Sequence, residues 1–534
     1  MSNANPPLWP ASVVVFGPSD ANITQTVAAL SASLNQRSTG HFSTQRLALL
    51  FAPGTYDADV QVGYYTQVLG LGAKASDVVF NGSRGVFSPA MDQRRGGAGS
   101  LDTFWRGAEG FRMASSAGML WAVSQAAPLR RLHIDHDLLL HDKGLYASGG
   151  FMANVQVGGT TQYGSQQQWF TRNCQLAPTE PSVMGGAWSL VFVGTIGAPP
   201  THGRYASGGP AGAVRVSTTA TTPIAIEKPF ITVRADGLFD LRVPLPMWNV
   251  SGASLEAEPD RMRTVPFENV YVARNETDSA ASLQAALAAG DHLVLTPGIY
   301  SIGSALTLSH PGQVLLGLGL ATLTAPLNGE PCVRVLPGVP GVRVGGLMLQ
   351  ASNVSGTGVN MTSLLNTTSL LEWGSEGVVD PGSSSDPGLI CDVYARTGGP
   401  DTSDTSVDVH VRIHSGHVIG DNVWLWRADH SALAPGESPS DPSLSEYHLV
   451  RDGEFRTNTG LEVFGDSVTM YGLAVEHTLR DLVRWSGSHG QTFFFQAELP
   501  YDATQVMGTF GRLVDLSSLP ASHCVHPTCS TSYL

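Results

Sequence analysis

The sequence predicts an all-β protein made of two parallel β-helices in tandem. Its 60 Gly and 33 Pro are spread along all 534 residues, so turns are frequent and the strands between them are short. Runs of apolar and β-branched residues recur about every 20 to 25 residues, as the coils of a parallel β-helix do, and their turns are irregular rather than two-residue hairpins. The two halves of the chain also resemble each other, which indicates a duplicated unit.

The internal repeat is clearest near the start of each half. Leu47–Tyr56 matches Leu293–Tyr300, and Gln67–Gly72 matches Gln313–Gly319, at an offset of roughly 245 residues. Because the repeated segments keep their order and spacing, we expect each half to fold in the same way.

Each half is expected to open with a short helix and to continue as strands. Stretches rich in Ala and Leu with helical spacing precede both copies of the repeat, at Asn22–Leu34 and at Ser279–Ala289, the second capped by Asp278. The strand-like runs that follow include Val78–Phe80, Val342–Leu349, Val407–Ile413, Val468–Val475 and Gln491–Phe495.

Domain boundaries follow from the repeat and from proline content. The segment from Pro244 to Pro266 is rich in proline and poor in strand patterns. We therefore expect an N-terminal β-helix over 1–244, a connecting segment over 245–266, and a C-terminal β-helix over 267–534.

Composition narrows the class of partner. The 30 basic and 44 acidic residues give a net charge of −14, which repels phosphate backbones and argues against nucleic acid. No run approaches the roughly 18 apolar residues of a membrane helix, so we expect a soluble protein without a membrane partner. A neutral ligand fits this composition better.

Cysteines and asparagines bear on the cellular compartment. Five cysteines in so long a chain do not indicate a disulfide framework, because the core is large enough to hold itself together. The first residues lack the basic and apolar regions of a signal peptide. N-x-S/T sequons nevertheless exceed the roughly three that chance would give, and we expect a secreted glycoprotein. The sequons begin at Asn22, Asn81, Asn249, Asn275, Asn353, Asn360 and Asn366.

Two glutamates carry the strongest chemical signal. Glu476 and Glu498 lie 22 residues apart, about one coil, so their side chains could project from one face of adjacent strands roughly 5 Å apart. Like charges this close raise the pKa of one carboxyl group, which gives a protonated acid beside an ionised neighbour, as glycosidic cleavage requires. Glutamates taken at random are more often solvated surface charges, but the apolar and aromatic neighbours of this pair favour a function.

Aromatic and histidine residues near the glutamates are open to two interpretations. Trp424, Trp426 and Trp485 could stack on sugar rings or fill a core. Asp429 and His430 could form a catalytic pair, although a histidine held by a neighbouring aspartate is more often structural.

No metal site is expected. The spacing of His410, His414 and His417 matches no standard site. In the tail, His523–Cys529 carries zinc-like residue types, but a local disulfide or two free thiols fits its spacing better.

Polar residues of the first half form a second candidate group. Gln125, Tyr146, Ser148 and Gln166–Gln168 fall on neighbouring predicted coils, where they could orient a water molecule by hydrogen bonds. A stacked amide ladder that stabilises the β-helix is the alternative.

Six motifs in order resemble those of glycoside hydrolase family 55, β-1,3-glucanases built as two tandem β-helices. The resemblance implies two tandem right-handed parallel β-helices of the pectin-lyase-like type and inverting, exo-acting hydrolysis of β-1,3-glucan without a cofactor. We expect a monomer, closer to a divergent bacterial-type branch than to fungal glucanases. The motifs are Val123–Ala126, Gly149–Met152, Gly164–Gln167, Asn422–His430, Val475–His477 and Gln496–Tyr501.

The same resemblance implies roles for individual residues. Glu498 matches the general acid and Glu476 its carboxylate neighbour. Gln125 and Gln167 correspond to the network that holds the attacking water, and Gln166 is expected to bind substrate. Tyr146, Ser148, Trp426, Asp429 and His430 are expected to contact substrate or line the cleft between the helices.

One departure from the family pattern concerns the C-terminus. Family members continue with further coils beyond the last motif, whereas this chain ends 36 residues after Glu498. The resemblance therefore implies that the second helix is truncated.

Two alternatives come from other functional classes. A non-catalytic carbohydrate-binding β-helix would keep the fold and bind oligosaccharide without releasing product. A polysaccharide lyase on a similar helix would act on uronates with Ca²⁺ in a basic cleft, which the net charge and the lack of an Asp-rich cluster argue against.

Overall fold

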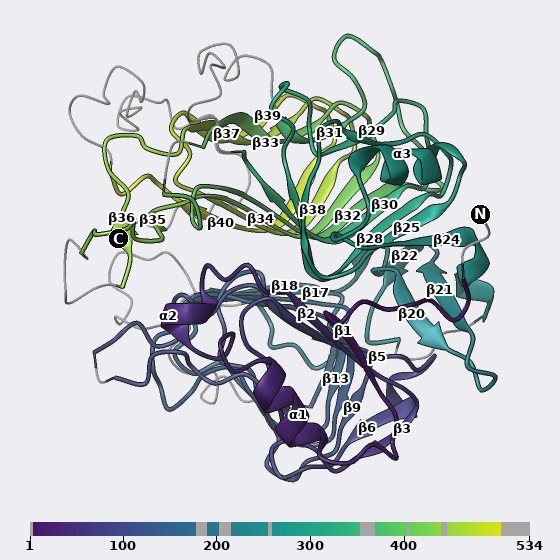
Figure 1. Cartoon of the computed structure of the whole chain (residues 1–534), viewed down its shortest axis with the longest axis vertical. Coiled ribbons are helices and arrows are strands. Elements are labelled where there is room, and N and C mark those ends of the chain that lie inside the picture. The colour runs from purple at the N-terminus through teal and green to yellow at the C-terminus, as the bar shows by residue number, and fades with distance from the viewer. Residues whose placement is uncertain are drawn as a thin grey trace.

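The structure is a computed structural model that describes residues 4–94, 96–177, 189–201, 215–254, 259–352, 369–402, 405–438 and 446–502. It consists of two stacked halves, each wound around its own parallel sheets (Figure 1). The prediction of an all-β protein with two tandem parallel β-helices is confirmed. Among the described residues no helix has the length and apolar character needed to cross a membrane.

The main sheet of the first half is parallel between all neighbours. Its order is β1 (Val13–Phe16), β2 (Leu47–Phe51), β5 (Thr66–Gly70), β8 (Arg106–Glu109), β11 (Leu129–Ile134), β13 (Phe151–Val157), β15 (Gln168–Arg172), β17 (Ser189–Val193) and β18 (Arg215–Thr219). Off this path, β3 (Gly54–Tyr56), β6 (Val78–Phe80) and β9 (Arg112–Met113) pair in turn. A second wall contains β10 (Met119–Leu120), β12 (Leu138–Leu139) and β14 (Thr161–Gln162).

The second half repeats this plan with longer strands. Its main sheet, parallel throughout, runs β24 (Val270–Ala273), β25 (His292–Leu295), β28 (Val314–Thr324), β30 (Arg343–Gln350), β32 (Gly388–Thr397), β34 (Val418–Arg427), β38 (Thr469–Glu476) and β40 (Gln491–Glu498). The opposite wall runs β27 (Leu306–Leu308), β29 (Val333–Val335), β31 (Ser369–Trp373), β33 (Val407–Ile413), β37 (Thr457–Val463) and β39 (Asp481–Trp485).

The two predicted helices exist, but a strand precedes each of them. Helix α1 (Ile23–Leu30) follows β1, and α3 (Ala280–Ala288) follows β24. The cap of α3 is Ser279 rather than Asp278, because the Ser279 hydroxyl accepts the backbone N–H of Ser282. A further short helix, α2 (Arg37–Gly40), precedes β2.

The connection between the halves is antiparallel. β19 (Thr222–Ala225) pairs with β22 (Met247–Val250), and β20 (Phe230–Val233), β21 (Phe239–Pro244) and β23 (Met262–Pro266) form a separate sheet. The expectation that 244–266 is poor in strands was therefore wrong. Pro244 and Pro266 each occupy the last position of a strand, where a missing N–H disturbs the hydrogen-bond ladder least.

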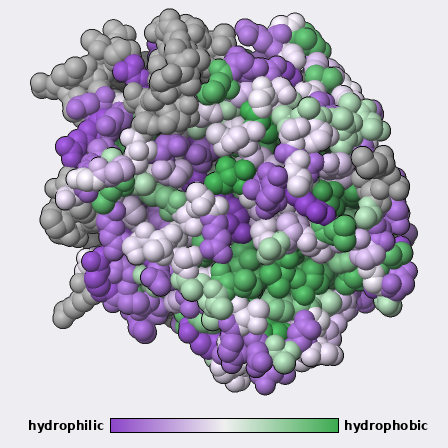
Figure 2. Space-filling model, in the orientation of Figure 1, coloured by the Kyte–Doolittle hydropathy of each residue, from purple (hydrophilic) through white to green (hydrophobic). Residues whose placement is uncertain are grey.

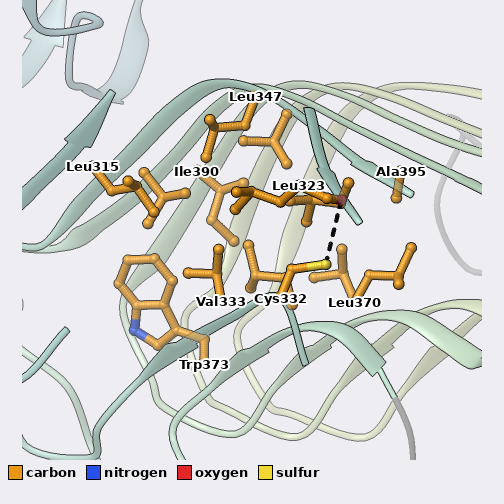
Figure 3. Packing of buried hydrophobic residues seen from close by; sticks show 14 of the residues in the cluster. Leu315, Leu323, Cys332, Val333, Leu347, Leu370, Trp373, Ile390 and Ala395 are labelled. Carbon is orange, nitrogen blue, oxygen red and sulfur yellow. Dashed lines mark hydrogen bonds between the residues drawn. The ribbon is translucent and has the colours of Figure 1, made fainter. Parts of the chain in front are cut away.

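Each half has its own apolar interior. In the second half, leucine, isoleucine and valine side chains from successive coils meet Trp373, and the Cys332 thiol donates to the Leu323 carbonyl oxygen at 3.6 Å (Figure 3). Apolar side chains also reach the surface of the first half near β1, its outermost strand, where Val15 is 38% exposed (Figure 2).

A column of residues in the left-handed backbone conformation runs across the main sheet of the second half. Gly346, Asp392, Asn422, Gly472 and Phe494 lie on five successive strands, β30 to β40, and each has a φ between 48° and 71°. The strand pairing skips each of these positions, as at a β-bulge. The alternation of side chains shifts at these positions. The left-handed residue and the residue before it both face the first half, and beyond the bulge every second residue faces it too.

Buried ion pairs join the halves across this surface. Arg130 on β11 donates to Asp392 at 2.8 Å and to Asp421 at 2.7 Å, and Arg172 on β15 donates to Asp421 at 2.9 Å and to Glu227 at 2.7 Å. Aromatic and aliphatic side chains of both halves pack around these pairs. The two β-helices are therefore held in one fixed arrangement.

Candidate active site

The two glutamates singled out from the sequence are direct neighbours. Glu476 ends β38, Glu498 ends β40, and the strand register places them opposite each other. Both lie beyond the bulge of their strands, on the face turned towards the first half. The predicted spacing of one coil is therefore confirmed.

The two carboxyl groups lie in different environments. Glu476 is 4% exposed, whereas the Glu498 side chain is 28% exposed. Burial, together with the charge of Glu498, raises the pKa of Glu476 well above its usual range. Glu476 therefore retains a proton at pH values where an ordinary glutamate is ionised, and Glu498 is the carboxyl group that a substrate can reach.

Hydrogen-bond donors hold Glu498 in place. Gln496 Nε2 donates to Glu498 Oε1 at 2.9 Å, and the Tyr501 hydroxyl donates to Glu498 Oε2. His477 Nε2 lies 3.9 Å from the same Oε2 atom, while its Nδ1 lies 3.0 Å from the Leu499 carbonyl oxygen. These contacts fix the carboxyl group of a partly exposed side chain.

The first half contributes a glutamine directly to the acid pair. Gln125 Nε2 donates to Glu476 Oε1 at 3.0 Å, across 351 positions of sequence. Gln125 also lines a small cavity between the halves, with about 30 Å³ of space for water, together with Gly149 and Gln168 of the first half and Trp424 and Gln496 of the second. The site is thus assembled from both β-helices.

The three consecutive glutamines have different surroundings. Gln166 is fully buried, and its amide is saturated by backbone groups: Nε2 donates to the carbonyls of Val123 and Leu140, and Oε1 accepts the N–H of Gly149. Its expected role in substrate binding was therefore wrong, since it has no donor left for a ligand. Gln168 lines the cavity and donates to Ser148 Oγ at 3.3 Å. Gln167 is not among the cavity-lining residues, so the structure offers Gln168 in its place.

The two other first-half candidates differ in exposure. Ser148 is 6% exposed and is held through its backbone N–H, which donates to Ser124 Oγ. Tyr146 is 60% exposed and lies outside the cavity lining. Of these two candidates, Ser148 is the one hydrogen-bonded to a residue that lines the cavity, Gln168.

The tryptophans are mostly core residues. Trp426 is 2% exposed, packs between the halves and donates from Nε1 to Asp429, so it presents no face to a sugar, contrary to the sequence-based expectation. Trp485 packs against the interior of the second half. Trp424 alone lines the cavity.

Asp429 and His430, both partly exposed, belong to a chain of polar groups that reaches the buried His41. His430 Nδ1 lies 3.0 Å from Asp429 Oδ1, and its Nε2 lies 3.0 Å from Nε2 of the fully buried His41, from the first half. Although burial alone would raise it, the neighbouring His430 and His477 lower the pKa of Asp429 below its usual range. Asp429 is thus an anion at the base of the site, 4.0 Å from His477 Nε2.

Comparison with known proteins agrees with this geometry. The LAM55 pectate lyase-like domain model matches residues 270–498, ending at the second glutamate. An exo-beta-1,3-glucanase of Streptomyces sp. (strain SirexAA-E / ActE) is 34% identical over 500 residues, which cover 92% of this chain and 73% of the relative. The chain belongs to glycoside hydrolase family 55.

Two solved structures of this family have the same fold. sacteLam55A from Streptomyces sp. SirexAA-E is 33% identical with a TM-score of 0.79, and its glutamate-to-alanine variant in complex with glucose is 32% identical with a TM-score of 0.80. Both comparisons cover 95% of this chain and 83% of the other. The resemblance to family 55 drawn from six motifs is confirmed.

Several site residues of this family 55 member were not assigned a role from the sequence. Gln496 and Tyr501 lie within a quoted motif, and their contact with the acid depends on the fold of the strand end. Gln168 was hidden in a run of three identical residues. His41 carries no local signal at all, because its partner His430 lies 389 positions away.

The remaining motifs do not form a site in the described residues. Among these, no group of three His, Cys, Asp or Glu is arranged to hold a metal ion. His410 is fully buried 2.9 Å from Thr397 Oγ1, and burial lowers its pKa to about 3. His523–Cys529 and the sequons at Asn353, Asn360 and Asn366 lie outside the described residues.

Proposed function

We propose that the protein is an inverting, exo-acting β-1,3-glucan hydrolase in which Glu498 is the general acid. The observation that carries the proposal is the in-register pair, in which Glu476 is buried and Glu498 is the carboxyl group that a substrate can reach. The Streptomyces relative named exo-beta-1,3-glucanase supports the substrate class, and the glucose complex of a glutamate-to-alanine variant supports a sugar-binding site.

The arrangement of the pair favours a single displacement by water. Retaining and inverting glycosidases both use two carboxyl groups that flank the scissile bond, but only in a retaining enzyme does one of them attack the anomeric carbon. Here they lie side by side on one sheet face, and Glu476 is buried with Gln125 bonded to its Oε1 atom. Glu476 is therefore a poor nucleophile.

The proposed reaction follows from these positions. Glu498 gives its proton to the glycosidic oxygen as the bond to the anomeric carbon breaks. A water molecule attacks the opposite face of that carbon and releases a proton to solvent. Gln125 and Gln168, which line the cavity with their amides, orient this water by hydrogen bonds.

Product analysis tests the proposal. Wild type, Glu498→Gln and the exposed control Glu376→Gln are incubated with laminarin and with reduced laminari-oligosaccharides, and the products are separated by chromatography. We expect glucose from wild type and control and a loss of about 10²- to 10⁴-fold in Glu498→Gln. Full activity in Glu498→Gln would overturn the assignment of the acid.

The other outcomes of that test identify the alternatives. Oligosaccharide binding without product, in a sample folded by circular dichroism, would indicate a non-catalytic carbohydrate-binding β-helix. Unsaturated products would indicate a lyase. Release of internal oligosaccharides before glucose would contradict the exo mode.

We further propose that the protein acts outside the cell as a monomer. The described site is built from one chain, and the sequon residues Asn22, Asn81 and Asn249 are exposed. Light scattering should give the mass of one chain, and peptide mapping of protein from its natural source should find glycans at these positions. A dimer mass or unmodified peptides would contradict the respective statement.

A further inference from the structure

Two glutamine amides have the same arrangement at the acid pair. Gln125 donates from Nε2 to Glu476, and Gln496 donates from Nε2 to Glu498. The Oε1 atom of each glutamine is buried and has no hydrogen-bond partner among the described residues. Both side chains line the small cavity between the halves.

Such a pair of acceptors has an energetic consequence. A buried amide oxygen without a donor costs free energy, and a water molecule is the small donor that can satisfy two acceptors at once. The cavity is roomy enough for water and has further polar groups, among them the Gln168 amide. Gln125 and Gln496 therefore each present an acceptor, one amide away from the acid pair, that a water molecule in this cavity can satisfy.

Gln496 alone connects that position to the reacting acid. Its N–H end contacts Glu498 Oε1 at 2.9 Å, and its carbonyl end lies in the cavity lining. As Glu498 gives up its proton, negative charge develops on its carboxylate, next to the N–H end of Gln496. As the water attacks, its protons become more acidic, and they bond to the carbonyl end of Gln496. Both changes strengthen hydrogen bonds to this one amide, so its dipole favours the transition state over the ground state.

We propose that Gln496 is a positioning residue for hydrolysis: its amide N–H stabilises Glu498 as the carboxylate forms, and its amide oxygen holds the attacking water. This inference rests on the proposed role of Glu498 as the acid. It adds to Gln125 and Gln168 a third water-orienting glutamine, one that comes from the same strand as the acid.

Position along β40 fits this role. Gln496 pairs with Ala474, which itself pairs with Trp424, so a small residue leaves room beside the cavity. Alternation along the strand points Gln496 and Glu498 to the same face. Gln491, at the other end of β40, is exposed and provides a matched control.

The charged and titratable groups around Glu498 define the test. They are Glu476 from β38, His477 after it, Tyr501 after β40, and Asp429 beyond His477. The variant Gln496→Met removes donor and acceptor at nearly constant volume and leaves these groups in place.

Steady-state kinetics on laminari-oligosaccharides are measured from pH 4 to 9 for wild type, Gln496→Met, Gln491→Met and Glu498→Gln. For Gln496→Met we expect kcat to fall about 10- to 100-fold with KM nearly unchanged. Gln491→Met should match wild type.

Two further results separate the possible failures. A Gln496→Met variant that is folded by circular dichroism but keeps wild-type kcat overturns the inference, and so does a loss of kcat/KM that comes from KM alone. If Gln496→Met fails to fold, Gln496→Glu, which keeps an acceptor oxygen, is measured in its place. If Glu498→Gln remains active, the proposed function itself fails, whatever Gln496 does.

Discussion

Removing the central aspartate of the interface should destabilise the whole molecule. The Asp421 side chain is 1% exposed and accepts hydrogen bonds from Arg130 at 2.7 Å and from Arg172 at 2.9 and 3.0 Å. In Asp421→Asn the charge is lost and an amide N–H is brought against two guanidinium groups. Each arginine keeps one other partner, Asp392 or Glu227, so the loss is that of a broken buried pair, about 3–5 kcal/mol.

Urea unfolding at pH 7, followed by far-ultraviolet circular dichroism, measures this loss. The matched control is Asp236→Asn, because Asp236 pairs with Arg234 where both side chains are well exposed, and its unfolding midpoint should not move. A loss below about 1 kcal/mol in Asp421→Asn would refute the claim that these ion pairs hold the halves together. Activity should fall with stability, because the interface brings Gln125 to Glu476.

Two further predictions concern single residues of the site. Burial raises the pKa of Glu476 above the ordinary 4.5, so above that pH the unfolded state binds fewer protons than the folded state and the free energy of unfolding falls as pH rises. Glu476→Gln should lack this fall, so the difference in unfolding free energy between variant and wild type, measured in urea, should widen from pH 4 to pH 8. Parallel dependences of the two proteins on pH would contradict this prediction. Gln166→Met should lower the urea midpoint of unfolding, because it leaves two backbone carbonyls and one backbone N–H without a partner. Gln168→Met should mainly lower kcat. Equal effects of the two changes on stability and on kcat would contradict the different surroundings of Gln166 and Gln168.

The position of Glu476 next to Glu498 could be predicted because it depends only on the length of one coil. One coil of a β-helix brings residues about 22 positions apart into register, so two glutamates at that spacing meet wherever the coil is regular. The duplicated segments likewise predicted two β-helices without any knowledge of how they pack.

Features that depend on contact between the halves could not be predicted in this way. Trp426 looks the same in sequence whether it faces solvent or another sheet, and only the first half covers it. The three glutamines differ because Gln166 turns into the coil interior while Gln168 turns outward, and a run of identical residues has no pattern that fixes the phase. The left-handed column from Gly346 to Phe494 shifts the alternation again, at residue types as different as Asp392 and Phe494.

The most direct test of the central claim compares two substrates with different leaving groups. If Glu498 donates the proton to the glycosidic oxygen, Glu498→Gln should lose about 10²- to 10⁴-fold in kcat on laminaritriose. It should lose far less on a 2,4-dinitrophenyl β-glucoside, whose leaving group departs without protonation. Equal losses on both substrates, or no loss on either, would contradict the assignment of Glu498 as the general acid.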